Sequence, residues 1–394
     1  LRMKKSICGR LGAISLREVR MFAHRPLFLF TMIVASVLCT IFFSSLMGEG
    51  LPTKLPTGLV DNDDTKTTRT IIRIIDSMEE TDFVARYSSF SEARRAMQRG
   101  EIYCFFYIPN KMTEDAIANR QPRLSFYTNE AYLMPGTLVM KDLRRACELA
   151  GIALTRETLY GKGLTEKQAM GVLQPIVVET HPLNNPYVDY SVCLNNTIVP
   201  GILILLVMLS TTYTIGLEWK LCTQRELYYI SGYSSTMALV GKLLPQTLVF
   251  SLMFLFYDVY FYKILMFPCN SGILPMMLLG VVSVLAAQAF GVFLFGLFLG
   301  QMRMAMSLCS LWGVLSVSMS GFAFPVPAMS GILQSLAWFF PLRHYYLIYV
   351  NQALDGYSIL YVWPSVVALL IFVLLPCTVL WRYRAAFLKY KYKQ

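Results

Sequence analysis

The stretch TIVPGILILLVMLSTTYTIGL, residues 197–217, contains no charged residue. An α-helix rises about 1.5 Å per residue, so crossing roughly 30 Å of hydrocarbon takes about 20 residues. A run of this length and composition therefore predicts a membrane-spanning helix. It decides the fold class, because similar runs occur on both sides of it.

Five further stretches pass the same test of length and composition. They are residues 27–46, 243–262, 273–300, 304–324 and 359–381. Only the second of these contains a charge, Asp258, near its end. Their composition, rich in Leu, Ile, Val and Phe, favours helices over the alternating strands of a barrel. The first run is followed by no small-residue cleavage site, so we expect a retained span and not a signal peptide.

The charge of the chain is concentrated at its two ends. Only 15% of the residues are charged, and the formal net charge is +11. Lys and Arg predominate in residues 1–26 and in the basic tail 382–394, whereas 47–195 is nearly neutral. Basic segments beside spans indicate the cytoplasmic side of a bilayer, so both ends are expected there, and no nucleic-acid partner is expected. Leu1 is an unusual first residue, which favours a native start at Met3 or upstream.

The uncharged run 304–342 is long enough to contain a seventh span. Pro325, Pro327 and Gly331 interrupt it, and the remaining residues 328–342 are too short to cross a bilayer. Two cytoplasmic ends also require an even number of spans. The sequence therefore predicts six spans, a cytoplasmic loop at 218–242 and an external re-entrant hairpin at 325–358.

Residues 47–195 alternate strand-like and helix-like segments. The expected strands are 57–60, 83–87, 102–108 and 124–127, and the expected helices are 71–78, 91–98 and about 133–174. Ser91 is the expected cap of the second helix. The alternation predicts an external α/β domain between spans 1 and 2. Its sequence contains no catalytic triad, so docking or gating is favoured over catalysis, and a disulfide among Cys104, Cys147 and Cys193 is left open.

Four pieces of sequence carry a resemblance to a known family. In chain order they are Glu18 with Arg25-Pro26, Asp61-Asn62-Asp63, Asn185-Pro186, and the stretch from Ser320-Gly321-Phe322 and Phe324-Pro325 through Leu333-Gln334 to Pro341. With one span, an external insert and five more spans, the chain resembles the ATP-binding-cassette type-2 exporter permeases over nearly its whole length. The resemblance implies outward transport by alternating access in the bacterial cytoplasmic (inner) membrane. It also implies that 1–26 form an amphipathic connecting helix on the membrane surface.

The loop 218–242 resembles the cytoplasmic coupling segment of this family. The matching residues are Glu218, Thr223, Glu226, Leu227, Gly241 and Lys242, whereas Trp219, Lys220 and Cys222 depart from the family pattern. We expect a short helix within 218–231 that docks on an ATPase. Its polar contacts are assigned to Glu218, Arg225 and Glu226, and its apolar contact to Leu227. A solvated loop without a partner is the alternative.

No cofactor, metal or catalytic site is expected in this chain. Gly241-Lys242 is the nearest approach to a phosphate-binding loop, but Thr236 stands where that motif needs its first Gly. ATP and Mg²⁺ are therefore assigned to a separate ATP-binding-cassette ATPase subunit. The resemblance also implies a second permease copy, in a homodimer or heterodimer, and a periplasmic adaptor is left open.

Two sets of residues within the spans are candidates for function. Asp258 is ionisable and so is a candidate for function, but it stands near the outer end of its span, and pairing with the nearby Lys263 at the membrane surface is the favoured explanation. Small hydroxylic residues on spans 2 and 5 either line a substrate path or let the helices approach closely. They are Ser210, Thr211, Thr214, Ser316 and Ser320.

The alternative to an exporter is a membrane-anchored scaffold or receptor whose external domain binds a partner. Five long spans after that domain argue against it, because one or two would anchor it. A membrane enzyme is disfavoured, since the sequence clusters no His, Cys or carboxylate residues near the spans.

Overall fold

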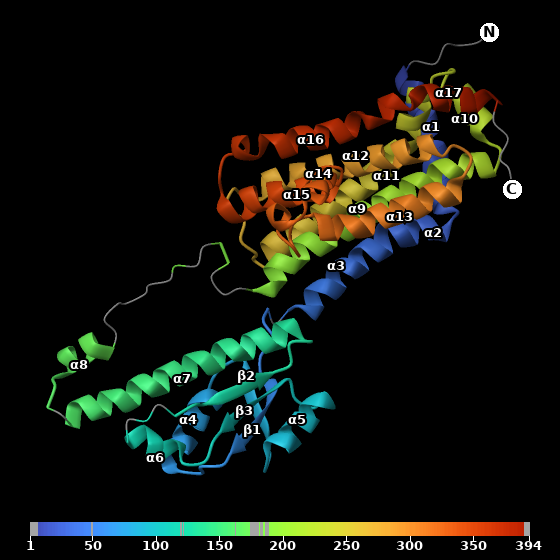
Figure 1. Ribbon diagram of the computed structural model, residues 1–394. Coiled ribbons are helices and arrows are strands. Elements are labelled where there is room, and N and C mark those ends of the chain that lie inside the picture. The colour runs from blue at the N-terminus through green and yellow to red at the C-terminus, as the bar shows by residue number, and fades with distance from the viewer. Residues whose placement is uncertain are drawn as a thin grey trace, which may run out of the picture. The chain divides into compact units, whose positions relative to one another are not determined.

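The computed structural model describes residues 7–48, 50–118, 120, 122–161, 163–173, 181, 184–185 and 189–389 (Figure 1). The chain forms two compact units. Residues 51–181 form an α/β unit, and the sequence on either side of it forms a helical unit. Pro186 and the outer ends of the predicted segments 1–26 and 382–394 lie outside the described residues.

The helical unit contains six helices that are long and apolar enough to cross a membrane, counted over the described residues. They are Pro26–Leu46, Tyr190–Lys220, Ser235–Ile264, Ile273–Leu297, Met302–Met319 and Ile359–Leu388. The prediction of six spans is confirmed. The α/β unit lies in the sequence between the first and the second span, also as predicted.

Three spans are continuous α-helices, and three are built from several helical segments. The continuous ones are α9 (Tyr190–Lys220), α12 (Ile273–Leu297) and α13 (Met302–Met319). The first span joins α2 (Pro26–Leu29), a π-helical turn η1 (Phe30–Val34) and α3 (Ala35–Leu46), and the third joins α11 (Ser235–Val259) to a π-helical turn η2 (Tyr260–Ile264). The last joins η5 (Ile359–Val362), α16 (Trp363–Leu374), a 3-10 turn η6 (Leu375–Thr378) and α17 (Leu380–Lys389). Pro376 lies in η6, and its missing backbone N–H explains the interruption there.

Three spans extend well beyond their predicted bounds, since the last continues to Leu388 instead of residue 381. In the other two, α9 and α11, polar residues find partners inside the bundle. α9 begins at Tyr190 instead of residue 197. Its Asn196 accepts hydrogen bonds from the hydroxyls of Tyr257 (2.7 Å) and Tyr262 (3.1 Å). α11 begins at Ser235 instead of residue 243, and the Ser234 side chain caps it. Uncharged composition alone therefore underestimates the length of these helices.

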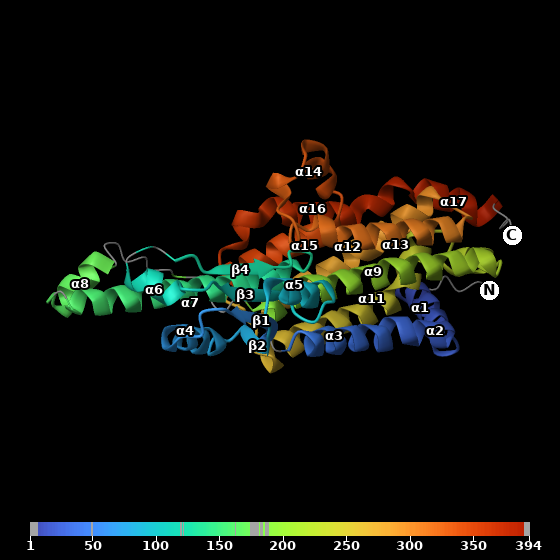
Figure 2. The same cartoon turned by 60° about the horizontal axis from the view of Figure 1, so that its bottom comes forward.

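Short helices follow α13, where an uncharged run had raised the question of a seventh span. They are η3 (Val326–Ala328), α14 (Gly331–Ala337), α15 (Pro341–Tyr349) and a π-helical turn η4 (Val350–Asp355). Gly321, with φ of +94°, follows the end of α13. α14 projects from the side of the bundle (Figure 2), whereas α15 buries Leu342, Tyr345 and Tyr349 in the core.

α9 is the central helix of the bundle and packs against α3, α12 and α13. Small residues permit these close contacts. A Cβ atom on Gly201 would lie 3.3 Å from the Val317 side chain of α13, and one on Gly313 of α13 would overlap Leu205 of α9. In a membrane, where the hydrophobic effect does not drive helices together, such close packing supplies much of the association energy.

The α/β unit is a four-stranded sheet with helices on both faces. Its strands are β1 (Leu55–Asp61), β2 (Thr81–Arg86), β3 (Cys104–Ile108) and β4 (Ser125–Thr128), in the spatial order β2-β1-β3-β4. β1 is parallel to β2 and β3, and β4 is antiparallel to β3. The helices are α4 (Lys66–Asp76), α5 (Phe90–Gln98), α6 (Met112–Ile117), α7 (Leu133–Gly161) and α8 (Glu166–Leu173). The predicted α/β fold is confirmed.

Alternating residues of β3 explain the two-sided packing of this sheet. Phe106 packs with residues of α4 and α7, and its neighbour Phe105 packs with Ala93 and Ala96 of α5. The expected cap of α5 was wrong by two residues, since Ser89, not Ser91, accepts from the Glu92 amide (3.3 Å). The long helix expected at about 133–174 is two helices, α7 and α8. All nine cysteines are free thiols, so the structure contains no disulfide among Cys104, Cys147 and Cys193.

Two buried carboxyl groups meet where β2 begins beside α7. Asp142 accepts from the backbone amide of Glu80 (3.1 Å), and Glu80 accepts from Lys141 (3.1 Å). Burial and the neighbouring Glu80 raise the pKa of Asp142 to about 6. Burial also acts to raise the pKa of Glu80, but hydrogen bonds from Asp142 and Lys141 outweigh it and lower that pKa. The pair therefore shares one proton at mildly acidic pH.

We predict that the stability of the α/β unit falls as pH rises from about 4 to about 6. The folded unit binds the Asp142 proton more tightly than the unfolded chain does, which stabilises the folded state. This stabilisation is complete below the unfolded pKa of about 4, and it is lost as pH rises through the folded pKa of about 6. The expected loss is on the order of 1 kcal/mol. Urea-dependent pulse proteolysis of the full-length chain in detergent measures it.

Asp142→Asn is the informative variant for this prediction, because an amide imitates the protonated acid. It is expected to match the wild type near pH 4 and to be the more stable of the two above pH 6. Asp115→Asn, at an exposed ion pair with Arg120 (3.6 Å), serves as the control. Parallel pH profiles for the wild type and Asp142→Asn would contradict the shared proton.

Candidate functional site

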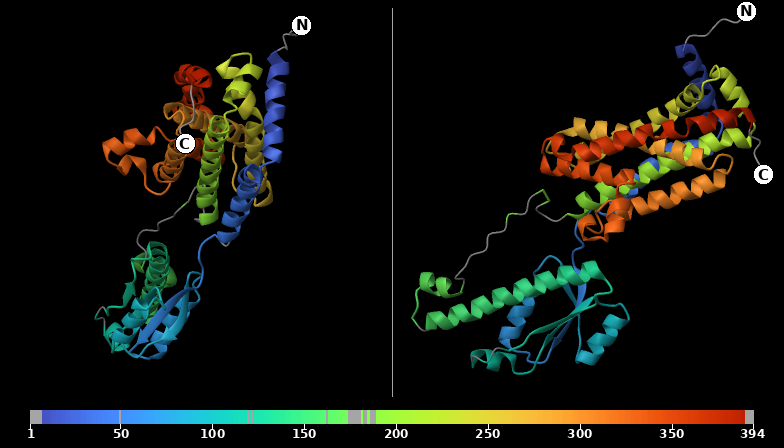
Figure 3. Two further views of the ribbon diagram at one scale, coloured as in Figure 1. Left: turned by 90° about the vertical axis from the view of Figure 1, so that its right-hand side faces the viewer. Right: turned by 45° about the horizontal axis from the view of Figure 1, so that its top comes forward.

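Four charged side chains meet at one end of the helical unit. That end holds α1 (Ile7–Ala23), α10 (Gln224–Ile230) and α17, which lie close together (Figure 3). The charged residues are Arg17 and Glu18 of α1, Glu218 near the end of α9, and Lys242 of α11. They are called the ion cluster below.

The spacing of residues along α1 explains why an acidic residue is buried there. Ile14, Glu18 and Phe22 are four residues apart, so they share one face of the helix, and all three are buried. This face packs against α11. Gly241 permits the close approach, since a Cβ there would lie 3.1 Å from Ile14, and its carbonyl accepts from Ser15 (3.0 Å).

Lys242 is the centre of the ion cluster. Its Nζ lies 2.7 Å from Glu18 Oε2 and 2.7 Å from Glu218 Oε1. Arg17 donates through two nitrogens to the two oxygens of Glu218, both at 3.0 Å, and also contacts Glu18 Oε1 at 3.2 Å. The Thr223 hydroxyl donates to Glu218 Oε2 at 2.6 Å. Both oxygens of each carboxylate are therefore bound.

The ion cluster is almost completely removed from solvent. The exposed fractions of the Glu18, Glu218 and Lys242 side chains are 0%, 2% and 1%, whereas Arg17 keeps 23%. Burial raises the pKa of Glu18, although Lys242 and Arg17 act in the opposite direction. Burial acts to lower the pKa of Arg17, but Glu218 outweighs it and raises that pKa. Two acids and two bases balance, which is the condition under which buried charges are tolerated.

The ion cluster is directly connected to α10. Thr223, which binds Glu218, is the residue that precedes this helix. The inner face of α10 buries Leu227 and Tyr228, and the Tyr228 ring stacks on Phe387 of α17 at 5.2 Å. Arg10 of α1 approaches Gly232, whose φ of +73° forms the turn after α10. α10 is thus held on several sides.

Of the residues that were expected to contact a partner, some are buried and others are exposed. Glu218 and Leu227 are buried, so neither presents its side chain to the surface as we had expected. The Glu218 carboxylate is occupied by Lys242 and Arg17, and Leu227 packs in the core. Arg225 and Glu226 are exposed on the outer face of α10, together with Tyr229 (54% exposed).

The five hydroxylic residues of spans 2 and 5 lie at helix contacts inside the chain. They are Ser210, Thr211, Thr214, Ser316 and Ser320, and all are buried. Ser316 and Ser320 donate to carbonyls of their own helix, and Thr211 accepts from Gln246 (2.9 Å). This placement favours their role in helix packing.

Asp258 points into the bundle and not toward Lys263. It is 1% exposed, and neither carboxylate oxygen has a hydrogen-bond partner among the described residues. Lys263, in contrast, is exposed. The expectation of a pair at the membrane surface was wrong, because the Asp258 side chain is buried in the bundle whereas Lys263 is exposed.

The described residues contain no candidate metal site. No group of three or more His, Cys, Asp or Glu residues is placed to hold a metal ion there.

Sequence analysis missed how Arg17, Glu18 and Lys242 come together. Two signals pointed to them. Glu18 lies on the same helical face as the apolar residues Ile14 and Phe22. Lys242 directly precedes the uncharged run that begins at residue 243, and both belong to α11. A charge in such a place needs an opposite charge, but the sequence does not say which one.

Comparison with known proteins gives one family. Residues 26–382 match the family described as ABC-2 family transporter protein, which covers most of the chain. A search of curated proteins finds no match.

We predict that Lys242→Met destabilises the helical unit by about 3–5 kcal/mol, because it leaves two buried carboxylates with only Arg17 to neutralise them. Thermal unfolding in detergent, followed by the fluorescence of the tryptophans, measures the change. Trp219 is a suitable reporter, since it is 1% exposed and packs on Phe387.

The double variant Lys242→Met, Glu18→Gln restores the charge balance and is expected to recover much of the lost stability. Arg99→Ala, which breaks an exposed ion pair with Glu101, is the matched control and should cost less than about 1 kcal/mol. A double variant that is less stable than Lys242→Met alone would contradict the role assigned to the ion cluster.

Proposed function

The chain belongs to the ABC-2 family of transporter membrane proteins, and on that premise we propose that it is the permease subunit of an ATP-driven exporter. In this proposal substrate moves outward by alternating access, and a second copy of the permease completes the path. The observation that carries the proposal is the connection from the exposed face of α10, through the ion cluster, to three other helices.

Energy for transport is assigned to a separate ATPase subunit that binds ATP and Mg²⁺. The sequence contains no phosphate-binding loop, and its nearest match, Gly241-Lys242, has other roles in the fold. Gly241 admits α1, and the ammonium group of Lys242 is held by two carboxylates. Membership of the family also implies an ATPase partner.

The outer face of α10 is the proposed docking surface for this ATPase. It presents Arg225, Glu226 and Tyr229, and Tyr233 follows at the next turn with 60% of its surface exposed. The face combines one charge of each sign with two aromatic rings. Aromatic residues and Arg are enriched among the side chains that dominate binding energy in protein interfaces.

The ion cluster is proposed to transmit movement of α10 into the spans. α10 follows α9 directly, and Glu218 at the end of α9 is bound to α1 through Arg17 and to α11 through Lys242. A displacement of α10 would therefore move α1, α9 and α11 together, since separating them exposes buried charges. Both chain ends and α10 are assigned to the cytoplasm, and the membrane to the bacterial inner membrane.

The α/β unit is proposed to lie outside the cell and to serve in docking or gating, with a periplasmic adaptor as one such partner. The helical unit is assigned to the lipid bilayer. Exposed apolar residues on its spans support this, for example Leu38, Leu248 and Val314, which are each more than half exposed.

We predict that Glu226→Arg weakens ATPase binding at least tenfold and reduces transport in proportion, because reversing a charge at an interface opposes the complementary charge of the partner. The fold should be unaffected, since Glu226 is exposed. Copurification of the ATPase with the permease, and ATP hydrolysis by the reconstituted complex in proteoliposomes, measure the effect.

Arg303→Glu is the control for this experiment, because it reverses an exposed charge just after the start of α13, outside α10. It should leave ATPase binding and hydrolysis near the wild-type level. Normal ATPase stimulation and transport by Glu226→Arg would reject docking through α10. Failure of any ATPase to copurify with the wild type would favour a scaffold or receptor over an exporter.

A further inference from the structure

Asp258 is a carboxyl group buried inside the bundle. It lies six residues before the end of the third span, Ser235–Ile264, which is about 9 Å along the helix from that end. The side chain is 1% exposed, so neither lipid nor a second chain can reach it. Neither of its oxygens has a hydrogen-bond partner among the described residues. An isolated charge in such a place is unfavourable, and an ionisable residue within a span is a candidate for function.

The packing of α11 explains why Asp258 is enclosed. Phe254 and Asp258 are four residues apart, so they share one face of α11. The Phe254 ring lies 6.3 Å from the Tyr345 ring of α15, and a Cβ atom on Gly280 of α12 would lie 3.1 Å from Phe254. This face of α11 is therefore covered by α12 and α15.

The ionisable groups that interact with Asp258 are neutral near pH 7 and supply no positive charge. They are the hydroxyls of Tyr257, Tyr262 and Tyr345 and the thiol of Cys269. Tyr349 of α15 interacts with Tyr257, and Cys193 of α9 interacts with Tyr349. α12 contains no ionisable residue, and Lys263 is exposed. None of these groups can balance a negative charge on Asp258.

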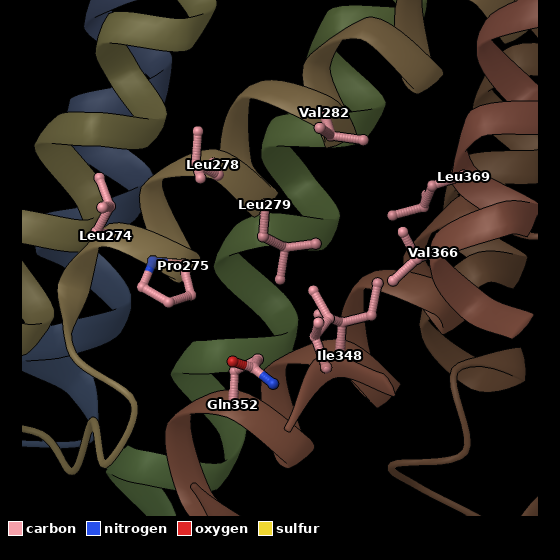
Figure 4. Close-up of a pocket in the computed structure, with 10 residues that line it drawn as sticks. Leu274, Pro275, Leu278, Leu279, Val282, Ile348, Gln352, Val366 and Leu369 are labelled. Carbon is pink, nitrogen blue, oxygen red and sulfur yellow. The ribbon is translucent and has the colours of Figure 1, made fainter. Parts of the chain in front are cut away.

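Three cavities of the helical unit also leave Asp258 without water. Two of them touch α11, but only between residues 236 and 249. The third, of about 330 Å³ between α12, α15 and α16, is lined by Leu279, Ile348 and Val366 among others, and by no residue of α11 (Figure 4). None of the three therefore hydrates the carboxyl group.

We propose that Asp258 is a proton-binding site. Its carboxyl group is protonated and neutral while α11 packs against α12 and α15. When these helices separate and water reaches Asp258, the O–H bond breaks and water accepts the proton. The carboxylate takes up a proton again when the helices close.

The cost of an isolated buried charge is the physical reason for this exchange. An acid without a partner or water becomes neutral, because taking up a proton costs less than burying the charge. An aspartate exposed to water ionises above about pH 4, so opening of the site releases one proton. Each rise of one pH unit therefore favours the open state about tenfold, relative to a variant that cannot ionise.

Infrared spectroscopy of the full-length chain in an ester-free detergent tests the proton directly, at about pH 8, where exposed aspartates are ionised. Asp142, with a pKa of about 6, is ionised there as well. We expect the carbonyl stretching band of a protonated carboxyl group, which carbon-13 labelling of aspartate shifts and Asp258→Asn removes. Asp355→Asn should keep the band, since Asp355 accepts from Asn184 (2.6 Å) and is ionised. Absence of the band in the wild type would overturn the proposal.

Amide hydrogen exchange tests the link between the proton and opening. Protection of residues 254–264 in the wild type, relative to Asp258→Asn, is expected to fall about tenfold per pH unit between about pH 6 and about pH 8. Comparison at each pH removes the intrinsic pH dependence of exchange, and the ratio of wild type to Asp355→Asn should stay constant. A constant ratio for Asp258→Asn as well would overturn the proposal. No ATP or ATPase is present, so neither outcome depends on the proposed transport.

Discussion

Burial of four charges at one end of an apolar bundle is the constraint on which the helical unit depends. Separating a buried ion from its partner costs several kcal/mol, so Lys242 must remain within reach of both Glu18 and Glu218. This requirement fixes α1 against α11 and fixes the end of α9 between them. α10 then follows from the position of α9, because Thr223 is bound to Glu218 as well.

Some of the other polar residues of the bundle also find partners inside it. Asn196 Oδ1 accepts from two tyrosine hydroxyls, and Gln246 Nε2 donates to Thr211 and to the Val207 carbonyl. Asp258 is an exception, since neither of its carboxylate oxygens has a hydrogen-bond partner among the described residues.

Much of the fold was predictable, because it rests on patterns that act locally. The six spans follow from long uncharged runs, and the α/β unit follows from alternating short segments. The bounds were less accurate at α9 and α11, where Asn196 and Lys242 lie inside the helices. A polar residue ends a predicted span only if it lacks a partner, and the partners are distant in sequence.

The sequence by itself determined the number of spans and the place of the α/β unit. Each depends on hydrophobicity and helix periodicity, which neighbouring residues decide. Only the tertiary structure decided which side chains between Glu218 and the end of α10 face outward. Glu218 and Glu226 are both acidic residues of the same loop, yet one is buried against Lys242 and the other is exposed. The difference comes from α1 and α11, more than 200 and about 20 residues away from Glu218, since ion pairing depends on distance in space and not on separation along the chain.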